Sequence, residues 1–166
     1  MQGGVFVAFV RMGNKRINQK EKYIFSSGLS KEEKKWILEC IDYVKSLNIP
    51  ISTNIYFKHC RCFDEIGWCE TEEDSKKAKC TIALSIYLNL HPEEYEIDFK
   101  ETCIHELLHT IKNKAKNPHK GQWKKYADII NQLHESDPEK HKYYIMERFW
   151  KNNLQIAKRM FSEKNR

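Results

Sequence analysis

The chain has 166 residues, of which 40% are hydrophobic and 31% are charged, and its formal net charge is +6. This length and composition are typical of a soluble protein with one folded domain, and they exclude global disorder. No apolar run approaches the roughly 20 residues of a membrane-spanning helix, so we expect no membrane partner. The apolar stretch 5–10 lacks the basic start and the length of a secretory signal, which predicts a cytoplasmic protein.

The first regular element is predicted after residue 28, because residues 1–28 read as a tail or an irregular lead-in. Ser30 followed by Glu33 is typical of a capping box, and apolar residues recur at helical spacing from Trp36 to Leu47. We therefore expect a helix over 30–48, which ends before Pro50.

Three strand segments follow, at 51–58, 66–69 and 80–90, and then three helical segments at about 98–112, 118–135 and 139–162. Strands grouped together and followed by helices predict an α+β domain with a small, mostly antiparallel three-stranded sheet. We expect one domain over 29–136 and a C-terminal helical extension over 137–166.

The segment His105-Glu106-Leu107-Leu108-His109 is an H-E-x-x-H motif within a predicted helix. Residues four apart differ by only about 40° around a helix, so both imidazoles can bind one metal ion. Glu106 borders the same face and can act as a general base without being a ligand. The alternative is a pair of surface histidines on a solvated helix.

A catalytic zinc site typically has three protein ligands, and His119 is the predicted third ligand. Pro118 disfavours helical geometry at Asn117, so the motif helix must end before that residue. We expect Asn117 to be the N-cap of the next helix and Pro118 to be its first residue. His119 then lies in the first turn, four residues before Trp123, and faces inward. It could instead be a half-buried capping histidine. Competing third ligands are Glu135, His134 and His91.

Residues 102–131 resemble the SprT-like (Spartan-type) zinc metallopeptidase domain, with weaker likeness over about 30–133. The resemblance implies a zincin-like fold, one catalytic zinc ion bound by His105, His109 and His119, and peptide hydrolysis with Glu106 as base. Better-known members cleave proteins that are bound or crosslinked to DNA. Two features depart from the family: Lys120 separates His119 from Gly121, and no cysteine follows Cys103 to form a zinc ribbon.

Other residues are chemically able to assist. The side chains that can stabilise an oxyanion are those of Tyr126, Tyr143, Tyr144 and Arg148. Six lysines and no acid lie between Lys112 and Lys125, which fits either a nucleic-acid contact or a solvated helix surface. A second, structural zinc site is one interpretation of His59, Cys60, Cys62, Cys69 and Cys80; free core thiols are the other.

The sequence thus predicts a zinc metallopeptidase, possible substrates being DNA-associated proteins. Two alternatives stay open: a non-catalytic zinc-stabilised module that binds nucleic acid, and a zinc hydrolase of a non-protein amide. Glu106 favours the two enzymes, because a structural zinc site requires no base.

Overall fold

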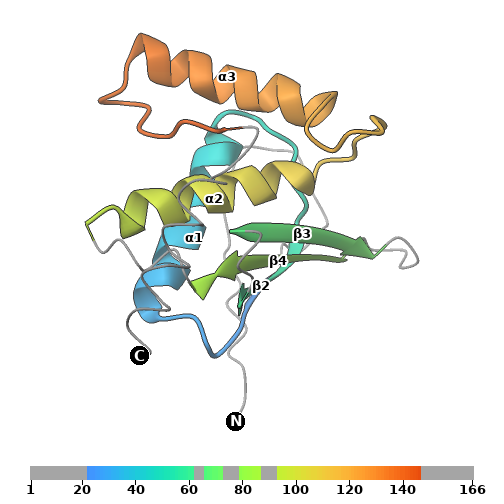
Figure 1. The fold of residues 1–166 in the computed structure, drawn as a ribbon, viewed down its shortest axis with the longest axis vertical. Coiled ribbons are helices and arrows are strands. Elements are labelled where there is room, and N and C mark those ends of the chain that lie inside the picture. The colour runs from blue at the N-terminus through green and yellow to red at the C-terminus, as the bar shows by residue number, and fades with distance from the viewer. Residues whose placement is uncertain (1–21, 62–65, 73–78, 87–92, 147–166) are drawn as a thin grey trace, which may run out of the picture.

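The structure is a computed structural model that describes residues 22–61, 66–72, 79–86 and 93–146 (Figure 1). Its elements are β1 (Lys22–Phe25), α1 (Lys31–Ser46), β2 (Asn54–Cys60), β3 (Gly67–Glu72), β4 (Lys79–Ser85), α2 (Tyr95–His109) and α3 (Gln122–Ser136). The predicted α+β class is confirmed.

The sheet has four strands in the order β1-β2-β4-β3, and it is mixed. β1 pairs with β2, and β2 with β4, in parallel, whereas β3 is antiparallel to β4. The prediction of a mostly antiparallel three-stranded sheet is therefore wrong. It missed β1, which lies in the segment expected to be irregular, and α1 is the crossover connection that a parallel β1–β2 pair requires.

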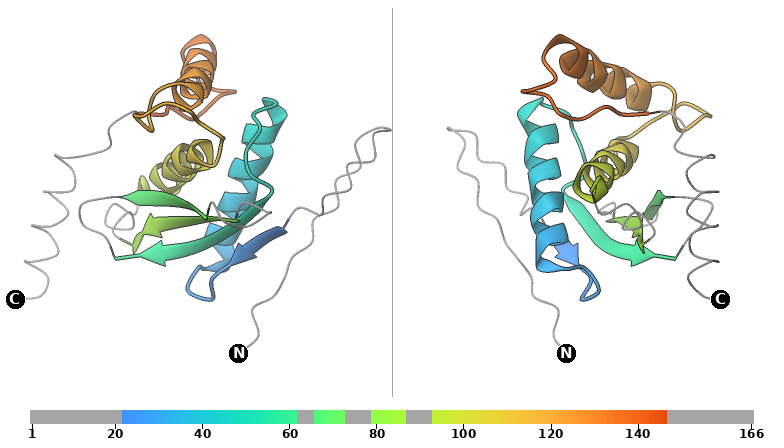
Figure 2. Two further views of the ribbon diagram at one scale, coloured as in Figure 1. Left: turned by 90° about the vertical axis from the view of Figure 1, so that its right-hand side faces the viewer. Right: turned by 60° about the vertical axis from the view of Figure 1, so that its left-hand side comes forward.

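The helices form two layers on one face of the sheet (Figure 2). α1 and α2 lie against the sheet, and α3 packs on the side of α2 that faces away from it. α2 is therefore enclosed, and every residue from Thr102 to Leu108 is buried. Alternate residues of β2 and β4, such as Phe57 and Ile82, fill the space beneath the helices and are fully buried.

The capping box at α1 is confirmed. The Ser30 Oγ accepts a hydrogen bond from the Glu33 N–H at 3.1 Å, and the Ser30 N–H donates to Glu33 Oε2 at 2.6 Å. α2 begins and ends about three residues before its predicted bounds.

The predicted C-terminal helix over 139–162 is wrong for the part of it that the structure describes. Residues 139–146, expected to begin a further helix, form a turn at 139–140 and a segment without regular structure at 141–146, and residues 147–162 lie outside the described residues. Within the part of the chain that the structure describes, every helix is too short or too polar to cross a membrane.

Candidate metal centre

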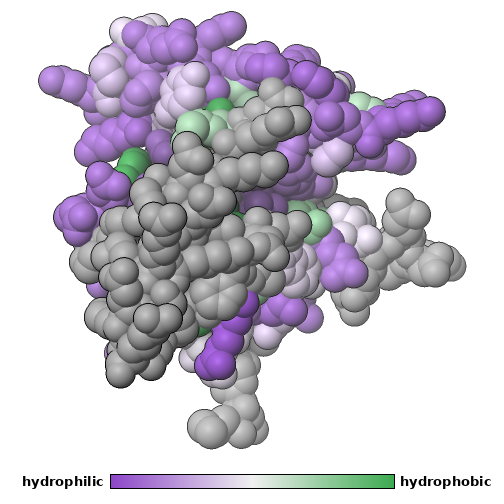
Figure 3. Space-filling view, viewed as in Figure 1, coloured by the Kyte–Doolittle hydropathy of each residue, from purple (hydrophilic) through white to green (hydrophobic). Residues whose placement is uncertain are grey.

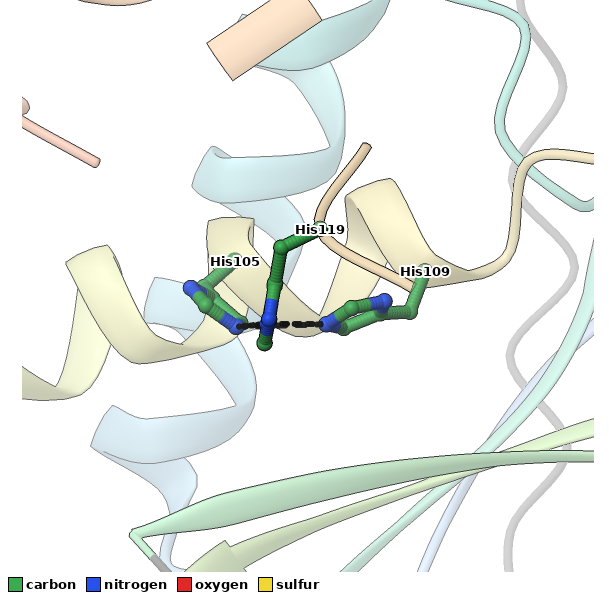
Figure 4. A group of neighbouring side chains, drawn as sticks. All are labelled: His105, His109 and His119. Atoms are coloured by element: carbon green, nitrogen blue, oxygen red, sulfur yellow. Dashed lines mark hydrogen bonds between the residues drawn. The ribbon is translucent and has the colours of Figure 1, made fainter. Parts of the chain in front are cut away.

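Three imidazoles converge on one point beside α2 (Figure 4). His105 and His109 lie one turn apart on α2, and His119 reaches them from the loop between α2 and α3. The three Nε2 atoms are 3.1–3.2 Å apart in all three pairs. Among the described residues, these form a group that can hold a metal ion.

The separations fit a metal better than they fit mutual hydrogen bonds. A neutral imidazole has one N–H, so three Nε2 atoms in a triangle cannot all be satisfied by one another. Nitrogen ligands of tetrahedral zinc lie about 2.0–2.1 Å from the ion, and hence roughly 3.3–3.4 Å from each other. The observed triangle is close to that size.

His105 is held in the tautomer that a ligand needs. Its Nδ1 is 3.0 Å from the carbonyl oxygen of Met146. Since a carbonyl can only accept, Nδ1 carries the proton and the Nε2 lone pair is free to bind a cation.

Trp123 packs against all three imidazoles. Its ring centroid lies 4.9 Å from that of His105, 5.6 Å from His109 and 4.7 Å from His119. The indole N–H donates to the His105 carbonyl at 3.3 Å. Trp123 is buried, so the first turn of α3 places an apolar wall behind the cluster and restricts the rotation of the rings.

The loop that carries His119 is organised by Asn113. Its Nδ2 donates to the carbonyl oxygens of Lys120 at 2.7 Å and Pro118 at 3.3 Å, and its Oδ1 accepts from Ala115 N at 3.2 Å. These bonds hold both sides of His119 to one side chain. Sequence reasoning missed Asn113, although an asparagine soon after a helix end is a recognised turn signal.

The predicted start of α3 is wrong. The N-cap is Gly121, with φ of 63°, and His119 lies before the helix rather than in its first turn. Asn117 does cap locally, but its Oδ1 accepts from His119 N at 2.9 Å within a turn and starts no helix. The glycine allows a backbone conformation that reverses the chain, which Pro118 alone did not reveal.

The side chain of Glu106, a residue of α2, lies against the edge strand β3 and is buried. A Cβ built on Gly67 would be 3.0 Å from both Cγ and Oε1 of Glu106. Because Glu106 is about 100° around α2 from His105, the helix presents its imidazoles to the loop and its carboxyl group towards β3. The Gly67 contact was not foreseen from the sequence.

Burial keeps the imidazoles on α2 neutral. Burial, together with the nearby His109 and His119, lowers the pKa of His105 to about 3. Burial and His119 lower the pKa of His109 to about 4. Both rings therefore offer lone pairs, not N–H⁺ groups, at neutral pH.

Two of the competing ligands, His134 and Glu135, are not part of the cluster. His134 Nδ1 bonds the His141 carbonyl oxygen at 2.8 Å, and Glu135 is exposed on α3. His91 lies outside the described residues.

The tyrosines named as oxyanion stabilisers have other contacts. Tyr143 packs on Tyr43 of α1 with ring centroids 4.9 Å apart, and Tyr144 packs on His134 at 5.7 Å. The Tyr126 ring has Lys125 Nζ above it, 5.3 Å from the ring centroid. Arg148 lies outside the described residues.

The suggested second zinc set is not assembled among the described residues. His59 Nε2 bonds Glu33 Oε1 at 3.0 Å, and Cys80 Sγ lies 3.8 Å from Thr71 Oγ1. Cys60 and Cys69 are half-buried and form no disulfide within the described ranges, and Cys62 lies outside those ranges.

The fold and the site define an α+β protein with a three-histidine group, one member buried and two half-buried, that can hold a metal ion. Comparisons of the chain with protein-family models, curated proteins and solved structures found no match.

Proposed function

We propose that this chain is a zinc-dependent metallopeptidase of SprT-like type. His105, His109 and His119 bind the zinc ion, and Glu106 is the general base. The observation that carries the proposal is the convergence of three Nε2 atoms, 3.1–3.2 Å apart, with a buried glutamate next in sequence to one of them.

The donor set supports zinc and a catalytic site. Imidazole nitrogen suits zinc, copper, iron and nickel, whereas calcium and magnesium prefer oxygen. Structural zinc sites close all four positions with protein ligands, whereas the group within the described residues has three histidines and so leaves a fourth position open. An open position is what a reactant requires.

The chemistry divides between the ion and the protein. Bound zinc supplies Lewis acidity and lowers the pKa of a water molecule towards neutrality. The Glu106 carboxylate accepts the proton of the attacking water and later delivers it to the leaving amine. Met146 and Trp123 hold the His105 ring in place throughout, through the Nδ1 bond and the ring contact.

The position of β3 supports a peptide substrate. β3 pairs only with β4 among the described strands, so its other side can hydrogen-bond an extended chain. Gly67, at the start of this strand, contacts Glu106. A peptide added to β3 would lie next to the general base, and this favours a peptidase over a hydrolase of a small amide.

The surface around His119 supports a substrate associated with nucleic acid. The described residues over α3 and the loop before it, at the top and upper right of Figure 3, are mostly hydrophilic. The exposed lysines of the loop and the start of α3 are Lys112, Lys114, Lys116, Lys120 and Lys125. The sixth, Lys124, pairs with Asp128. The same lysines also suit the non-catalytic alternative, a zinc-stabilised module that binds DNA.

One experiment separates these functions. The purified protein is analysed for zinc and then incubated with an unstructured protein substrate, with and without single-stranded DNA. We expect about one zinc ion per chain, cleavage that a chelator abolishes, and recovery on adding zinc. Zinc without cleavage under either condition would support the binding module, and cleavage of small amides alone would support the third function.

A further inference from the structure

A short C-terminal segment, residues 141–146, crosses from α3 to α2 and reaches the metal centre; we call it the strap. Its backbone is fixed by side chains of both helices. Glu101 Oε1 accepts from Tyr144 N at 2.8 Å, and His134 Nδ1 bonds the carbonyl oxygen of His141 at 2.8 Å. The strap is therefore docked at several points, although it is not a helix or a strand.

Asn131 of α3 makes the most specific of these contacts. Its Nδ2 donates to the Ile145 carbonyl oxygen at 2.8 Å, and its Oδ1 accepts from Ile145 N at 2.6 Å. One amide thus pairs with both backbone groups of one residue, as a neighbouring strand would. The Ile145 side chain is buried in the core, which fixes the same residue from its other side.

The next residue in the strap is Met146, and its carbonyl oxygen accepts a hydrogen bond from His105 Nδ1–H at 3.0 Å. Fixing the N–H and C=O of Ile145 determines where the following peptide group, and hence the Met146 carbonyl, can lie. Asn131 is in this way connected to the metal centre through two backbone residues, although it contacts no imidazole in that cluster.

We infer that Asn131 is a positioning residue for the metal centre: through Ile145 and Met146 it holds His105 in the tautomer and orientation that bind zinc. The inference rests on the proposed function only in that these histidines are zinc ligands. Without the carbonyl, the proton of His105 can move to Nε2 and the ring can turn. Partners of this kind typically change metal affinity by about 10- to 100-fold when removed.

The test compares two variants at this position with a control on the same helix. Asn131→Asp retains the size and the acceptor for Ile145 N, but it places a carboxylate against the Ile145 carbonyl. Asn131→Ala removes both bonds. Ile130→Val is the control, because Ile130 is fully buried beside Asn131 in sequence and has no part in the strap contacts described above.

Zinc affinity is measured by competition with a chromophoric chelator, and the cobalt-substituted proteins are compared by their visible spectra. We expect about tenfold or greater loss of zinc affinity in both Asn131 variants, with a changed cobalt spectrum. Ile130→Val should lower the melting temperature and leave affinity and spectrum unchanged. Equal zinc affinity in wild type and both Asn131 variants overturns the inference, while zinc binding and cleavage by wild type would leave the proposed function standing.

A measurement on the unaltered protein covers the case in which the variants do not fold. If the docked strap strengthens zinc binding, bound zinc must stabilise the docked strap by the same free energy. Zinc should therefore slow deuterium exchange of the Ile145 and Tyr144 amides. Nitrogen-15 spectra of the imidazoles should show His105 protonated at Nδ1. Exchange that zinc does not alter, or a His105 proton on Nε2, overturns the inference. A wild-type protein that binds no zinc overturns the proposed function as well.

Discussion

Gly67 and Glu106 are in direct contact across the boundary between β3 and α2. A Cβ at residue 67 would be 3.0 Å from Glu106 Cγ, Glu106 Oε1 and Thr102 Cγ2. This spacing is tighter than ordinary van der Waals contact, so the carboxyl group of Glu106 occupies space that exists because residue 67 has no side chain. The edge strand therefore limits where the Glu106 carboxyl group, the proposed general base, can lie.

Gly67→Ala should displace the Glu106 carboxyl group. We expect kcat to fall by about 10- to 100-fold, because small displacements of a catalytic group have effects of this size. Zinc content should not change, since Gly67 contacts none of the three histidines in the contacts described. Steady-state kinetics and metal analysis measure both.

The control for that substitution is Gly28→Ala. Among the described atoms, a Cβ at residue 28 would meet only Ser26 Oγ, at 3.6 Å, which is an ordinary contact. If Gly67→Ala is as active as Gly28→Ala, β3 does not position the base.

Glu106→Gln should separate catalysis from metal binding. Glutamine has nearly the same shape but cannot accept a proton at neutral pH, so we expect kcat to fall by at least about 100-fold. Zinc stoichiometry should remain that of wild type. Cleavage at the wild-type rate by this variant would rule out Glu106 as the general base.

Gly121→Ala should weaken zinc binding through the loop that carries His119. Residue 121 has φ of 63°, and a Cβ there would be 2.5 Å from Asn113 Oδ1. We expect a loss of about 1–3 kcal/mol in the free energy of unfolding. Zinc affinity should also fall, because Asn113 holds both sides of His119. Chelator competition and chemical denaturation measure the two effects.

Lys120→Ala is the control for the loop, because the Lys120 side chain is exposed and alanine retains the backbone carbonyl that accepts from Asn113 Nδ2. Equal zinc affinity in Gly121→Ala and Lys120→Ala would show that the added Cβ at residue 121 does not disturb the position of His119.

Acid should destabilise the protein through Glu33. Burial raises the pKa of Glu33, but hydrogen bonds from His59, Tyr95 and Ser30 N–H outweigh it and lower the pKa to about 2. The folded state thus binds fewer protons than the unfolded state between about pH 4.5 and 2. The stability that Glu33 contributes is complete above that window and is lost as the pH falls through it.

Glu33→Gln should reduce the free energy of unfolding at pH 7 by about 1.5–3 kcal/mol, the range for hydrogen bonds to a charged group. It should also flatten the fall in stability below pH 4.5. Denaturation curves at several pH values measure this. An unchanged slope in the variant would mean that other carboxyl groups cause the acid dependence.

The exposed lysines near His119 should set the affinity for single-stranded DNA. Replacing Lys114, Lys116 and Lys120 with glutamine removes three charges from one surface. If each contacts a phosphate, the slope of log K against log salt should become smaller by about 2, from roughly 0.7 per contact. Fluorescence anisotropy at several salt concentrations measures the slope.

The matched control replaces Lys22, Lys31 and Lys140, which are also exposed but lie outside this loop. An equal loss of affinity in both triple variants would mean that DNA responds to net charge alone and that no specific surface exists.

The sequence by itself determined the features that depend on near neighbours. Ser30 and Glu33 are three residues apart, so the capping box could be recognised from spacing, and the structure contains it. His105 and His109 share one helix face for the same reason. His119 was selected because Pro118 implied a break in the chain, and the structure does bring its Nε2 to 3.1 Å from both other imidazoles.

Only the tertiary structure decided the features that depend on distant partners. Alternation along the chain indicates a strand but not its neighbour, so the parallel pairing of β1 with β2 was not predicted. The contact of Gly67 with Glu106 and the bond from His105 to Met146 join residues 39 and 41 positions apart. Local propensity carries no information about such contacts, because they form only when packing of the hydrophobic core brings separate elements together.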